Sequence, residues 1–248
     1  MIDVIMKKVK LNKKQQQAVD LILSGVNVFL TGDAGTGKTT VVQQSVKALE
    51  KDEKNVLIAA TTGVAAEAFK ANEDMDKNGD GICQYMVLEG EAGHQDSIVR
   101  TEYSVNTLID NGVELEKLGY AIANWNRAQA QTKTAALLTQ YAGRIELIIA
   151  NNDDMALGAI DALRDSKIPK EDWPGVVGID GTDVGLAAVK RGEMIGTVYN
   201  DKEGQAQEML NLAFAIATGG SKKDIPFIDG KYVRTPYHKV TLDNVDDY

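Results

Sequence analysis

Cysteine, proline and aromatic residues are scarce in this chain of 248 residues, which has one cysteine, four prolines and 6% aromatic residues. The single cysteine, Cys83, excludes a disulfide within the chain, and its position in an apolar run predicts a buried strand residue. With so few prolines and no low-complexity tract, no linker marks a domain boundary. No apolar run approaches the ~20 residues of a membrane-spanning helix. A length of 248 residues suits one large domain or two small ones.

A secretory signal is also absent from the start of the sequence. Residues 1–10 lack an apolar core and a small-residue cleavage site, so the chain as written is expected to stay in the cytoplasm. The net charge is −9, and residues 1–70 hold ten lysines and seven acidic residues, so the remainder carries −12. An acidic body argues against a broad nucleic-acid surface. The charge asymmetry suggests two parts of different origin.

Apolar runs bounded by turn residues alternate with stretches of helical period, which predicts an α/β fold with a mainly parallel sheet. The predicted strands are Asn27–Thr31, Asn55–Ala60, Cys83–Leu88, Ile145–Ala150, Gly175–Ile179 and Gly196–Tyr199. The predicted helices are Asn12–Leu23, Lys38–Glu50, Val64–Ala71, Ser97–Asn111, Arg127–Tyr141, Asp153–Arg164, Val184–Lys190 and Gly204–Thr218.

A glycine-rich motif of the form G-x-x-x-x-G-K-[ST] follows the first predicted strand and opens a helix. Its glycines let backbone N–H groups surround phosphate oxygens, its lysine neutralises the outer phosphates, and its threonine hydroxyl can bind magnesium. A chance glycine-rich turn is the alternative. The candidate nucleotide-binding residues of the motif are Gly32, Gly35, Thr36, Gly37, Lys38 and Thr39.

The segments Leu11–Gln15, Gly32–Thr39 and Val56–Ala66 resemble, in order, the opening motifs of superfamily-one DNA helicases of the RecD-like branch. The resemblance implies that residues 1–66 form a P-loop NTPase-like front, that Gln15 reads adenine, and that Mg-ATP is a cofactor. No Asp-Glu pair follows to hold magnesium and polarise water. We therefore expect ATP binding without a complete ATPase site, and assign no catalytic residue.

A second motif, Asp76–Gln84, places oxygen-bearing side chains at positions one, three, five and nine of an EF-hand-like loop, with glycine at position six. These side chains belong to Asp76, Asn78, Asp80 and Gln84, and Ile82 adds its carbonyl. Position twelve is valine instead of the usual glutamate. From the residues alone, a calcium loop and a plain Asx-rich turn both stay open.

The segments Lys70–Met75, Asp76–Gln84 and Leu88–Asp96 resemble bacterial galactose/glucose-binding proteins, and the match continues in register to Gly196–Asp201. The resemblance implies that residues 67–248 form a type I periplasmic-binding-protein-like lobe of three layers. It also implies that Glu146, from a distant strand, completes a seven-oxygen calcium site.

In the same family a hexose lies between two lobes, and the resemblance carries its ligands to seven positions. Carboxylates, amides and a guanidinium suit sugar hydroxyls, and an indole suits the C–H face of a pyranose. Without the family these residues would pass as helix caps, core, surface or turn residues. The implied sugar-binding residues are His94, Asp96, Arg100, Trp125, Asn152, Asp180 and Asn200.

Two functions therefore stay open. The first is a non-enzymatic lobe that binds galactose or glucose and holds structural calcium, in a family that docks on a sugar permease of the ABC type and on a chemoreceptor. The alternative is a P-loop ATPase or DNA helicase fragment. The family's first lobe, which gives the sugar another aspartate, an aromatic ring and an asparagine, is replaced by the helicase-like front, so the chain resembles a natural or engineered chimera.

Overall fold

The computed structural model describes residues 11–23, 41, 45, 76–221, 225–227, 233 and 235–248. The chain contacts divide it into two compact units, Met1–Ile58 and Ala59–Tyr248. The domain boundary expected between residues 66 and 67 lies outside the described residues and stays a prediction. The predicted strands at residues 27–31 and 55–60 and the predicted helix at residues 64–71 also lie outside them.

In the first unit, helix α1 (Lys13–Leu23) confirms the helix predicted from residue 12. A reciprocal pair of hydrogen bonds starts it: the Gln15 N–H donates to Asn12 Oδ1 and the Asn12 N–H donates to Gln15 Oε1, both at 2.9 Å. This is a capping box, which satisfies two backbone donors that the first helical turn leaves free. Val41 and Ser45 are also helical, in agreement with the predicted helix at residues 38–50.

The second unit is built on one six-stranded sheet with the order β2-β1-β3-β4-β5-β6. The first five strands in this order run parallel and β6 is antiparallel to β5. The α/β fold with a mainly parallel sheet is therefore confirmed. The strands are β1 (Ile82–Glu89), β2 (Glu114–Ile122), β3 (Leu147–Ala150), β4 (Gly175–Val177), β5 (Gly196–Asn200) and β6 (Tyr237–Thr241).

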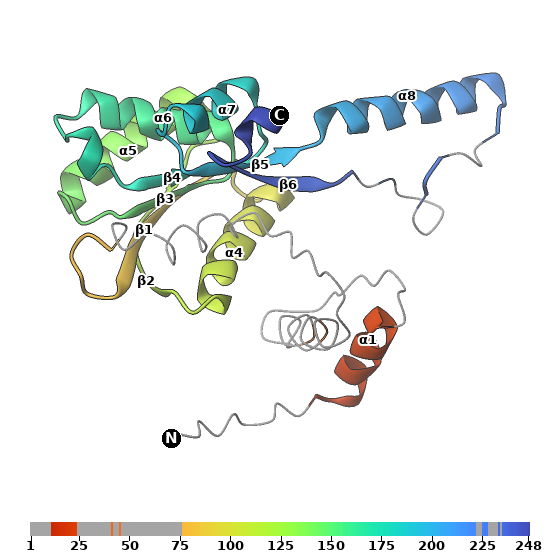
Figure 1. The fold of residues 1–248 in the computed structure, drawn as a ribbon, viewed down its shortest axis with the longest axis horizontal. Coiled ribbons are helices and arrows are strands. Elements are labelled where there is room, and N and C mark those ends of the chain that lie inside the picture. The colour runs from red at the N-terminus through yellow and green to blue at the C-terminus, as the bar shows by residue number, and fades with distance from the viewer. Residues whose placement is uncertain are drawn as a thin grey trace. The chain divides into compact units, whose positions relative to one another are not determined.

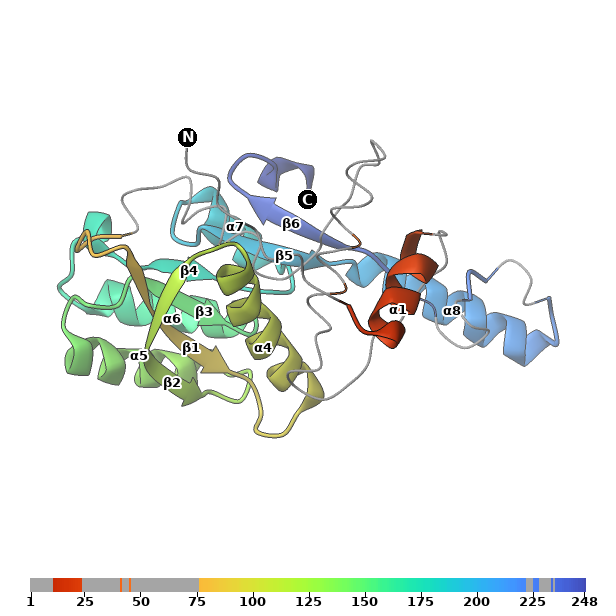
Figure 2. The same ribbon diagram turned by 90° about the horizontal axis from the view of Figure 1, so that it is seen from below.

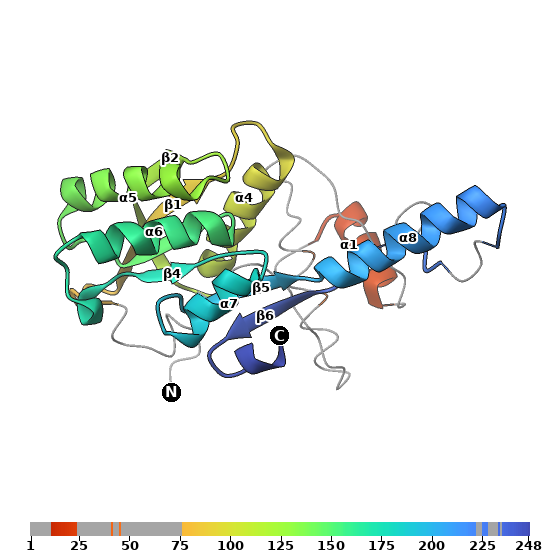
Figure 3. The same cartoon turned by 90° about the horizontal axis from the view of Figure 1, so that it is seen from above.

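Helices cover both faces of this sheet, which makes three layers (Figure 1). Helix α4 lies over one face, as Figure 2 shows, and α5, α6 and α7 lie over the other, as Figure 3 shows. Each of these helices begins and ends within two residues of its predicted bounds. The helices are α4 (Gln95–Asp110), α5 (Arg127–Tyr141), α6 (Asp153–Asp165), α7 (Asp183–Lys190) and α8 (Lys202–Thr218), with 3-10 turns at Lys170–Asp172 and Val245–Asp247.

The side chains of β1 alternate between two covered faces, which is why this strand is mainly apolar, with Gln84 as the polar residue inside its run. Cys83, Tyr85 and Val87 pack with Leu108 of α4, whereas Met86 and Leu88 pack into the core shared with α5, α6 and α7. Cys83 is fully buried, as predicted. Burial raises the pKa of its thiol to about 12, so the thiol stays protonated.

Two strands were not predicted, β2 and β6, and both lie at edges of the sheet. Glu114, Glu116 and Lys117 keep much of β2 exposed, so it lacks the apolar run that marks the central strands. Strand β6 is short, and its only buried residue is Val240. An edge strand needs a buried face only toward one neighbour, which leaves a weak signal in the sequence.

Helix α8 begins where β5 ends and extends away from the sheet (Figures 1 and 3). Its only buried residue is Ala215, and its large apolar side chains are exposed, among them Met209, Leu210 and Phe214. Within the part of the chain that is described, no helix is long and apolar enough to cross a membrane.

Candidate functional site

All seven predicted sugar-binding residues lie where the parallel strands end. Because the carboxyl ends of parallel strands meet at one edge of a sheet, the segments after β1, β2, β3, β4 and β5 come together there. His94 is the N-cap of α4, and Asn152 is the N-cap of α6. Asp180 follows β4 and Asn200 is the last residue of β5. Open α/β sheets bind ligands at this edge, which we call the carboxyl edge.

Arg100 connects several of these residues at the carboxyl edge. Its Nη1 donates to Asp180 Oδ1 at 3.1 Å and to the Asn151 carbonyl at 2.8 Å. Its guanidinium carbon lies 5.7 Å from the ring centre of Trp125, within the range of a cation–π contact. The imidazole of His94 meets the same indole edge-on at 5.5 Å. The structure thus brings four of the seven predicted residues into one contact group, His94, Arg100, Trp125 and Asp180.

The other three predicted residues lie beside this group. The Asp96 N–H donates to His94 Nδ1 at 3.2 Å, and the Asp96 carboxylate is exposed. Asn152 Oδ1 accepts the Met155 N–H at 3.0 Å and so caps α6. Asn200 Oδ1 accepts a hydrogen bond from Gln205, while the Asn200 N–H donates to the Asp180 carbonyl at 3.0 Å. The roles of all seven residues in sugar binding stay predictions.

Backbone strain is concentrated at the same edge. Among the described residues, only Asn124, Trp125 and Asp180 combine a side chain with a φ above 20°, at 52°, 60° and 121°. Such conformations cost about 1–3 kcal/mol each and persist only where surrounding contacts hold them. Two of the three residues are predicted sugar ligands.

Gly90, which the sequence analysis did not single out, makes room for Trp125. A Cβ at position 90 would lie 2.3 Å from two atoms of the indole and 2.5 Å from Ser97 Oγ. Ser97 is fully buried, and its hydroxyl has no hydrogen-bond partner among the described residues. The glycine therefore allows the indole to lie against the end of β1.

The buried residue Asn151 holds Arg100 in place through its backbone carbonyl. Asn151 is fully buried, and its Nδ2 donates to Thr101 Oγ1 at 3.0 Å. Its Oδ1 accepts the Gly90 N–H at 3.2 Å. Thr101 Oγ1 also lies 3.3 Å from Glu89 Oε2. These contacts fix the Asn151 carbonyl that accepts from Arg100, and the Arg100 side chain keeps only 15% of its surface exposed.

Burial determines the electrostatics of Asp180. It raises the pKa of the Asp180 carboxyl, and the guanidinium of Arg100 opposes that rise. The nearby carboxylates of Asp154 and Asp96 add to it. A half-buried carboxylate paired with one guanidinium is a strong acceptor for a neutral ligand's hydroxyl groups.

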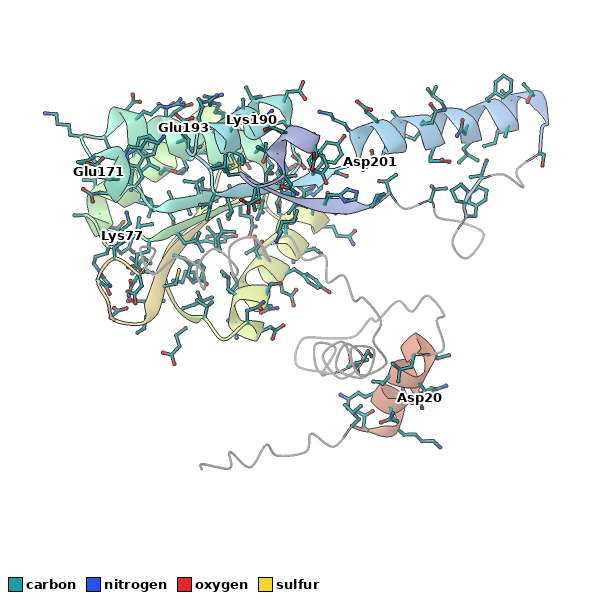
Figure 4. All side chains as sticks on the ribbon, in the orientation of Figure 1. Asp20, Lys77, Glu171, Lys190, Glu193 and Asp201 are labelled. Carbon is teal, nitrogen blue, oxygen red and sulfur yellow. The ribbon has the colours of Figure 1, made fainter. Side chains whose placement is uncertain are left out.

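The predicted calcium loop lies at the opposite end of the strands, before β1. Figure 4 shows its residue Lys77 at one end of the sheet and Asp201 at the other. Asp76 Oδ1 and Oδ2 accept N–H groups of Gly79 and Gly81, both at 2.8 Å. Gly79 and Gly81 have φ of 72° and 79°, and Gly81 stands at the position where an EF-hand-like loop needs glycine.

Glu146 reaches this loop from a distant part of the chain. Its two carboxylate oxygens accept the N–H groups of Lys77, at 2.8 Å, and Gln84, at 3.1 Å. The Gln84 side chain bridges Asn78 Nδ2, at 3.0 Å, and Asp80 Oδ2, at 2.9 Å. Glu146 is only 1% exposed, so its charge is costly without a cation.

The predicted calcium ligands are therefore joined in one hydrogen-bonded group, with three carboxylates and two amides, the hard oxygen donors that calcium prefers. Ile82 begins β1, and its N–H donates to Asp80 Oδ1 at 2.8 Å. In the geometry shown by the described residues, no three His, Cys, Asp or Glu side chains converge on a single point that could hold a metal. The donor chemistry fits calcium, and its binding stays a prediction.

The predicted nucleotide site is described only at Gln15. Its side-chain oxygen takes part in the capping box of α1, which is a structural role. Gly32, Gly35, Thr36, Gly37, Lys38 and Thr39 lie outside the described residues. ATP binding stays a prediction.

A cavity of about 810 Å³ lies near the calcium loop, away from the carboxyl edge. Its walls come mainly from the ends of α5 and α6 and the segment up to Pro174, and Lys77 is its only residue from the calcium loop. It contains none of the predicted sugar ligands. The chemistry at the carboxyl edge, and not the size of this cavity, therefore defines the candidate site.

A parallel sheet between two helical layers, with polar and aromatic side chains at its carboxyl edge, defines an α/β ligand-binding lobe. The chain belongs to the family described as periplasmic binding protein domain, whose sequence profile matches residues 12–221. The periplasmic-binding-protein-like family that the resemblance implied is thereby confirmed.

Two relatives illustrate the family. The D-galactose/methyl-galactoside binding periplasmic protein MglB of Haemophilus influenzae is 36% identical over 191 residues, which are 74% of this chain and 55% of that protein. An ABC transporter solute binding protein from Bacillus halodurans, solved with bound myo-inositol, is 26% identical with a TM-score of 0.59. That comparison covers 95% of this chain and 81% of the other. The chain thus spans little more than half the length of the first relative.

The helicase likeness is much shorter. The ATP-dependent DNA helicase Pif1 of Bdellovibrio bacteriovorus is 46% identical over 59 residues, which are 24% of this chain and 13% of the helicase. The periplasmic-binding-protein profile begins at residue 12 and so also covers most of the front. A chimeric origin of the chain stays a prediction.

Proposed function

We propose that this chain binds a hexose of the galactose or glucose type at the carboxyl edge of its sheet, without chemical turnover. The observation that carries the proposal is the contact group of Arg100, Asp180 and Trp125. It combines the three kinds of group that a pyranose needs: a carboxylate, a bidentate donor and an aromatic face. The relative from Haemophilus influenzae is named for galactose binding.

Each residue has a distinct task in this proposal. Asp180 accepts hydrogen bonds from sugar hydroxyls, and Arg100 donates to a neighbouring sugar oxygen while neutralising Asp180. Trp125 covers the C–H face of the ring, and its contact with Gly90 fixes the indole plane. His94, Asp96, Asn152 and Asn200 surround this group from the ends of other strands and contribute further hydrogen bonds.

We expect modest affinity, because the sugar is held by the ligands of one lobe. In the two-lobed family described above, two more polar residues and a stacking ring close over the sugar. Their loss costs roughly 1.5–3 kcal/mol for each polar partner and about 1 kcal/mol for the ring. That total weakens binding by about three to five powers of ten.

We further propose that calcium binds the hydrogen-bonded group of oxygen donors around Glu146. The ion would supply charge compensation for Asp76, Asp80 and Glu146 and would join the loop to a residue more than sixty positions later. We expect the partner classes of the family, a sugar permease of the ABC type and a chemoreceptor. The cytoplasmic location expected from the sequence stays a prediction. It differs from the location in the name of the relative from Haemophilus influenzae, which is a periplasmic protein.

Tryptophan fluorescence tests the sugar proposal directly, because the chain has only two tryptophans, Trp125 and Trp173. Trp173 lies away from the carboxyl edge. Its Nε1 donates to the Ile168 carbonyl at 3.0 Å. The Trp173→Phe variant leaves Trp125 as the only reporter. We expect galactose or glucose to change its emission in a saturable way at millimolar concentrations.

The matched variant is Trp125→Phe, in which only Trp173 reports. Its emission should stay constant during the same titration. If sugar changes the Trp173 signal and leaves that of Trp125 unchanged, the site does not lie at the carboxyl edge. If neither responds at any sugar concentration, the proposed function is wrong.

A further inference from the structure

Asp153 is a fully buried carboxylate that the sequence analysis did not assign to any site. It is the first residue of α6, and none of its surface is exposed. Its Oδ1 accepts from Thr197 Oγ1 of β5 at 2.6 Å. Its Oδ2 accepts from the Thr182 N–H at 2.7 Å and from Thr182 Oγ1 at 3.1 Å. One side chain thus joins α6, β5 and the segment between β4 and α7.

Two glycines leave the space that this carboxylate occupies. A Cβ at Gly178 would lie 2.4 Å from Asp153 Oδ1, and a Cβ at Gly185 would lie 2.2 Å from Oδ2. The end of β4 and the start of α7 therefore approach the carboxylate more closely than any residue with a side chain allows. The packing around Asp153 is specific to a carboxylate-sized group held at this point.

These contacts enclose Asp180 on both sides along the chain. The Asp153 N–H donates to the Ile179 carbonyl at 2.8 Å, and its carboxylate accepts the Thr182 N–H. Between these two anchored residues lies Asp180, with φ of 121°. A residue with a side chain keeps such a φ only where its neighbours are fixed. Asp153 fixes both neighbours of the strained turn.

Burying this carboxylate is costly. Burial raises the pKa of the Asp153 carboxyl to about 6, and the charge of Asp180 adds to the rise, while the three donors oppose it. An apolar residue of similar volume often stabilises a protein more than a buried charge does. Because an apolar residue would often be more stabilising here, we infer that the hydrogen bonds of this carboxylate serve a purpose other than stability.

We propose that Asp153 is a positioning residue for the sugar site: it holds the turn of Asp180 so that the Asp180 carboxylate faces Arg100 and the sugar. Asp153 does not touch the sugar and acts only through Asp180. The inference rests on the proposed function, because it assigns a task to Asp180 as a sugar ligand. Asp153 is not one of the predicted sugar ligands, but its substitution should lower the affinity for sugar.

A double-mutant cycle separates an effect through Asp180 from a general one. Asp153→Ala should weaken galactose or glucose binding at least about tenfold, the equivalent of one lost hydrogen bond. In the Asp180→Ala background the same change should have almost no further effect, because the turn then has no ligand to position. Asp165→Ala, at the other end of α6, is the matched control and should leave affinity unchanged.

Asp153→Asn provides the conservative variant. Its amide oxygen can still accept from the Thr182 N–H, and its amide nitrogen can donate to Thr197 Oγ1, whose hydroxyl can rotate to accept. Affinity within about threefold of the original is therefore expected. If Asp153→Ala does not fold, Thr197→Val replaces it in the cycle, because it removes one donor without changing the volume.

Hydrogen exchange gives a readout that needs no sugar. In Asp153→Ala or Thr197→Val, the amide of Thr182 should exchange faster, while amides in β1 keep their protection. If no sugar binds the original chain, the proposed function fails, and this exchange experiment still decides whether Asp153 holds the turn. The inference is overturned if Thr182 exchange is unchanged. It is also overturned if the folded variants keep full affinity or if their loss adds in full to that of Asp180→Ala.

Discussion

The guanidinium of Arg100 and the carboxylate of Asp180 lie 3.1 Å apart although eighty residues separate them in the chain. The contact exists because α4 follows β1 while Asp180 follows β4, and the two strands end at the same edge of the sheet. The pair is largely buried, with side-chain exposures of 15% and 30%. A buried ion pair by itself contributes little to the free energy of folding. We therefore expect this pair to contribute mainly to ligand binding, through its hydrogen-bonding groups.

Gly90→Ala should reduce both stability and sugar affinity. The new methyl group would overlap the indole of Trp125, and relieving such overpacking typically costs about 1–3 kcal/mol. Urea unfolding and a sugar titration measure the two effects. Gly220→Ala is the matched control, because its added Cβ would meet nothing nearer than 3.2 Å. Equal behaviour of the two variants would show that Trp125 does not depend on Gly90.

Calcium should raise the melting temperature of the second unit, and chelator should lower it. An ion that binds only the native state stabilises it by about 2.7 kcal/mol at a hundredfold excess over Kd. Glu146→Gln should remove most of this response, because Glu146 brings its carboxylate to the loop from outside it. Glu171→Gln, at an exposed position, should keep it. The same melting temperature in excess calcium and in chelator would leave residues 76–84 as a plain turn.

Asp153→Asn should stabilise the protein more at neutral than at acid pH. The pKa of the Asp153 carboxyl is raised from 3.8 to about 6 in the folded protein, so the native state binds more protons between these values. The contribution of the protonated Asp153 carboxyl to the free energy of unfolding is fully present below about pH 4 and is lost as the pH rises through 6. The asparagine has no such loss.

Urea unfolding of both proteins at several pH values measures this difference. The stability of the variant relative to the original should increase by about 2–3 kcal/mol across this pH window. A difference that stays constant or decreases with pH would mean that the buried carboxyl does not titrate as proposed.

Lys38→Ala tests the alternative reading of the front. If the glycine-rich motif binds Mg-ATP, removing this cation from the phosphates should weaken binding at least about tenfold. A fluorescent nucleotide titration measures it, with Lys47→Ala as a control outside the motif. Robust DNA-stimulated ATP hydrolysis by the original chain would contradict the expectation that the ATPase site is incomplete.

The sequence predicts the central strands and the helices of the second unit well because their signals are local. Mainly apolar runs mark β1 and β3, and the N-cap Asn152 marks the start of α6. Strands β2 and β6 were missed because an edge strand with one exposed face carries no such run. The residues of the loop left a calcium loop and a plain turn open, and the expectation that Glu146 approaches it came from the family resemblance.

The supporting residues of the site have no comparable local signal. Asp153 follows an N-cap asparagine and reads as an ordinary acidic first-turn residue, favourable to the helix dipole. Its role depends on Thr182, the N-cap of α7, and on Thr197 of β5, which meet it only in the folded chain. Gly90 reads as a turn glycine until the position of the Trp125 indole is known.

Calorimetric titration of the original chain and of Asp180→Ala with galactose and with glucose tests whether the carboxyl edge binds a hexose through Asp180. We expect saturable binding of at least one hexose by the original chain. Asp180→Ala should weaken it roughly ten- to a hundredfold, since a hydrogen bond to a charged group contributes about 1.5–3 kcal/mol. Identical titrations of the two proteins, or no binding of either hexose by the original chain, would contradict it.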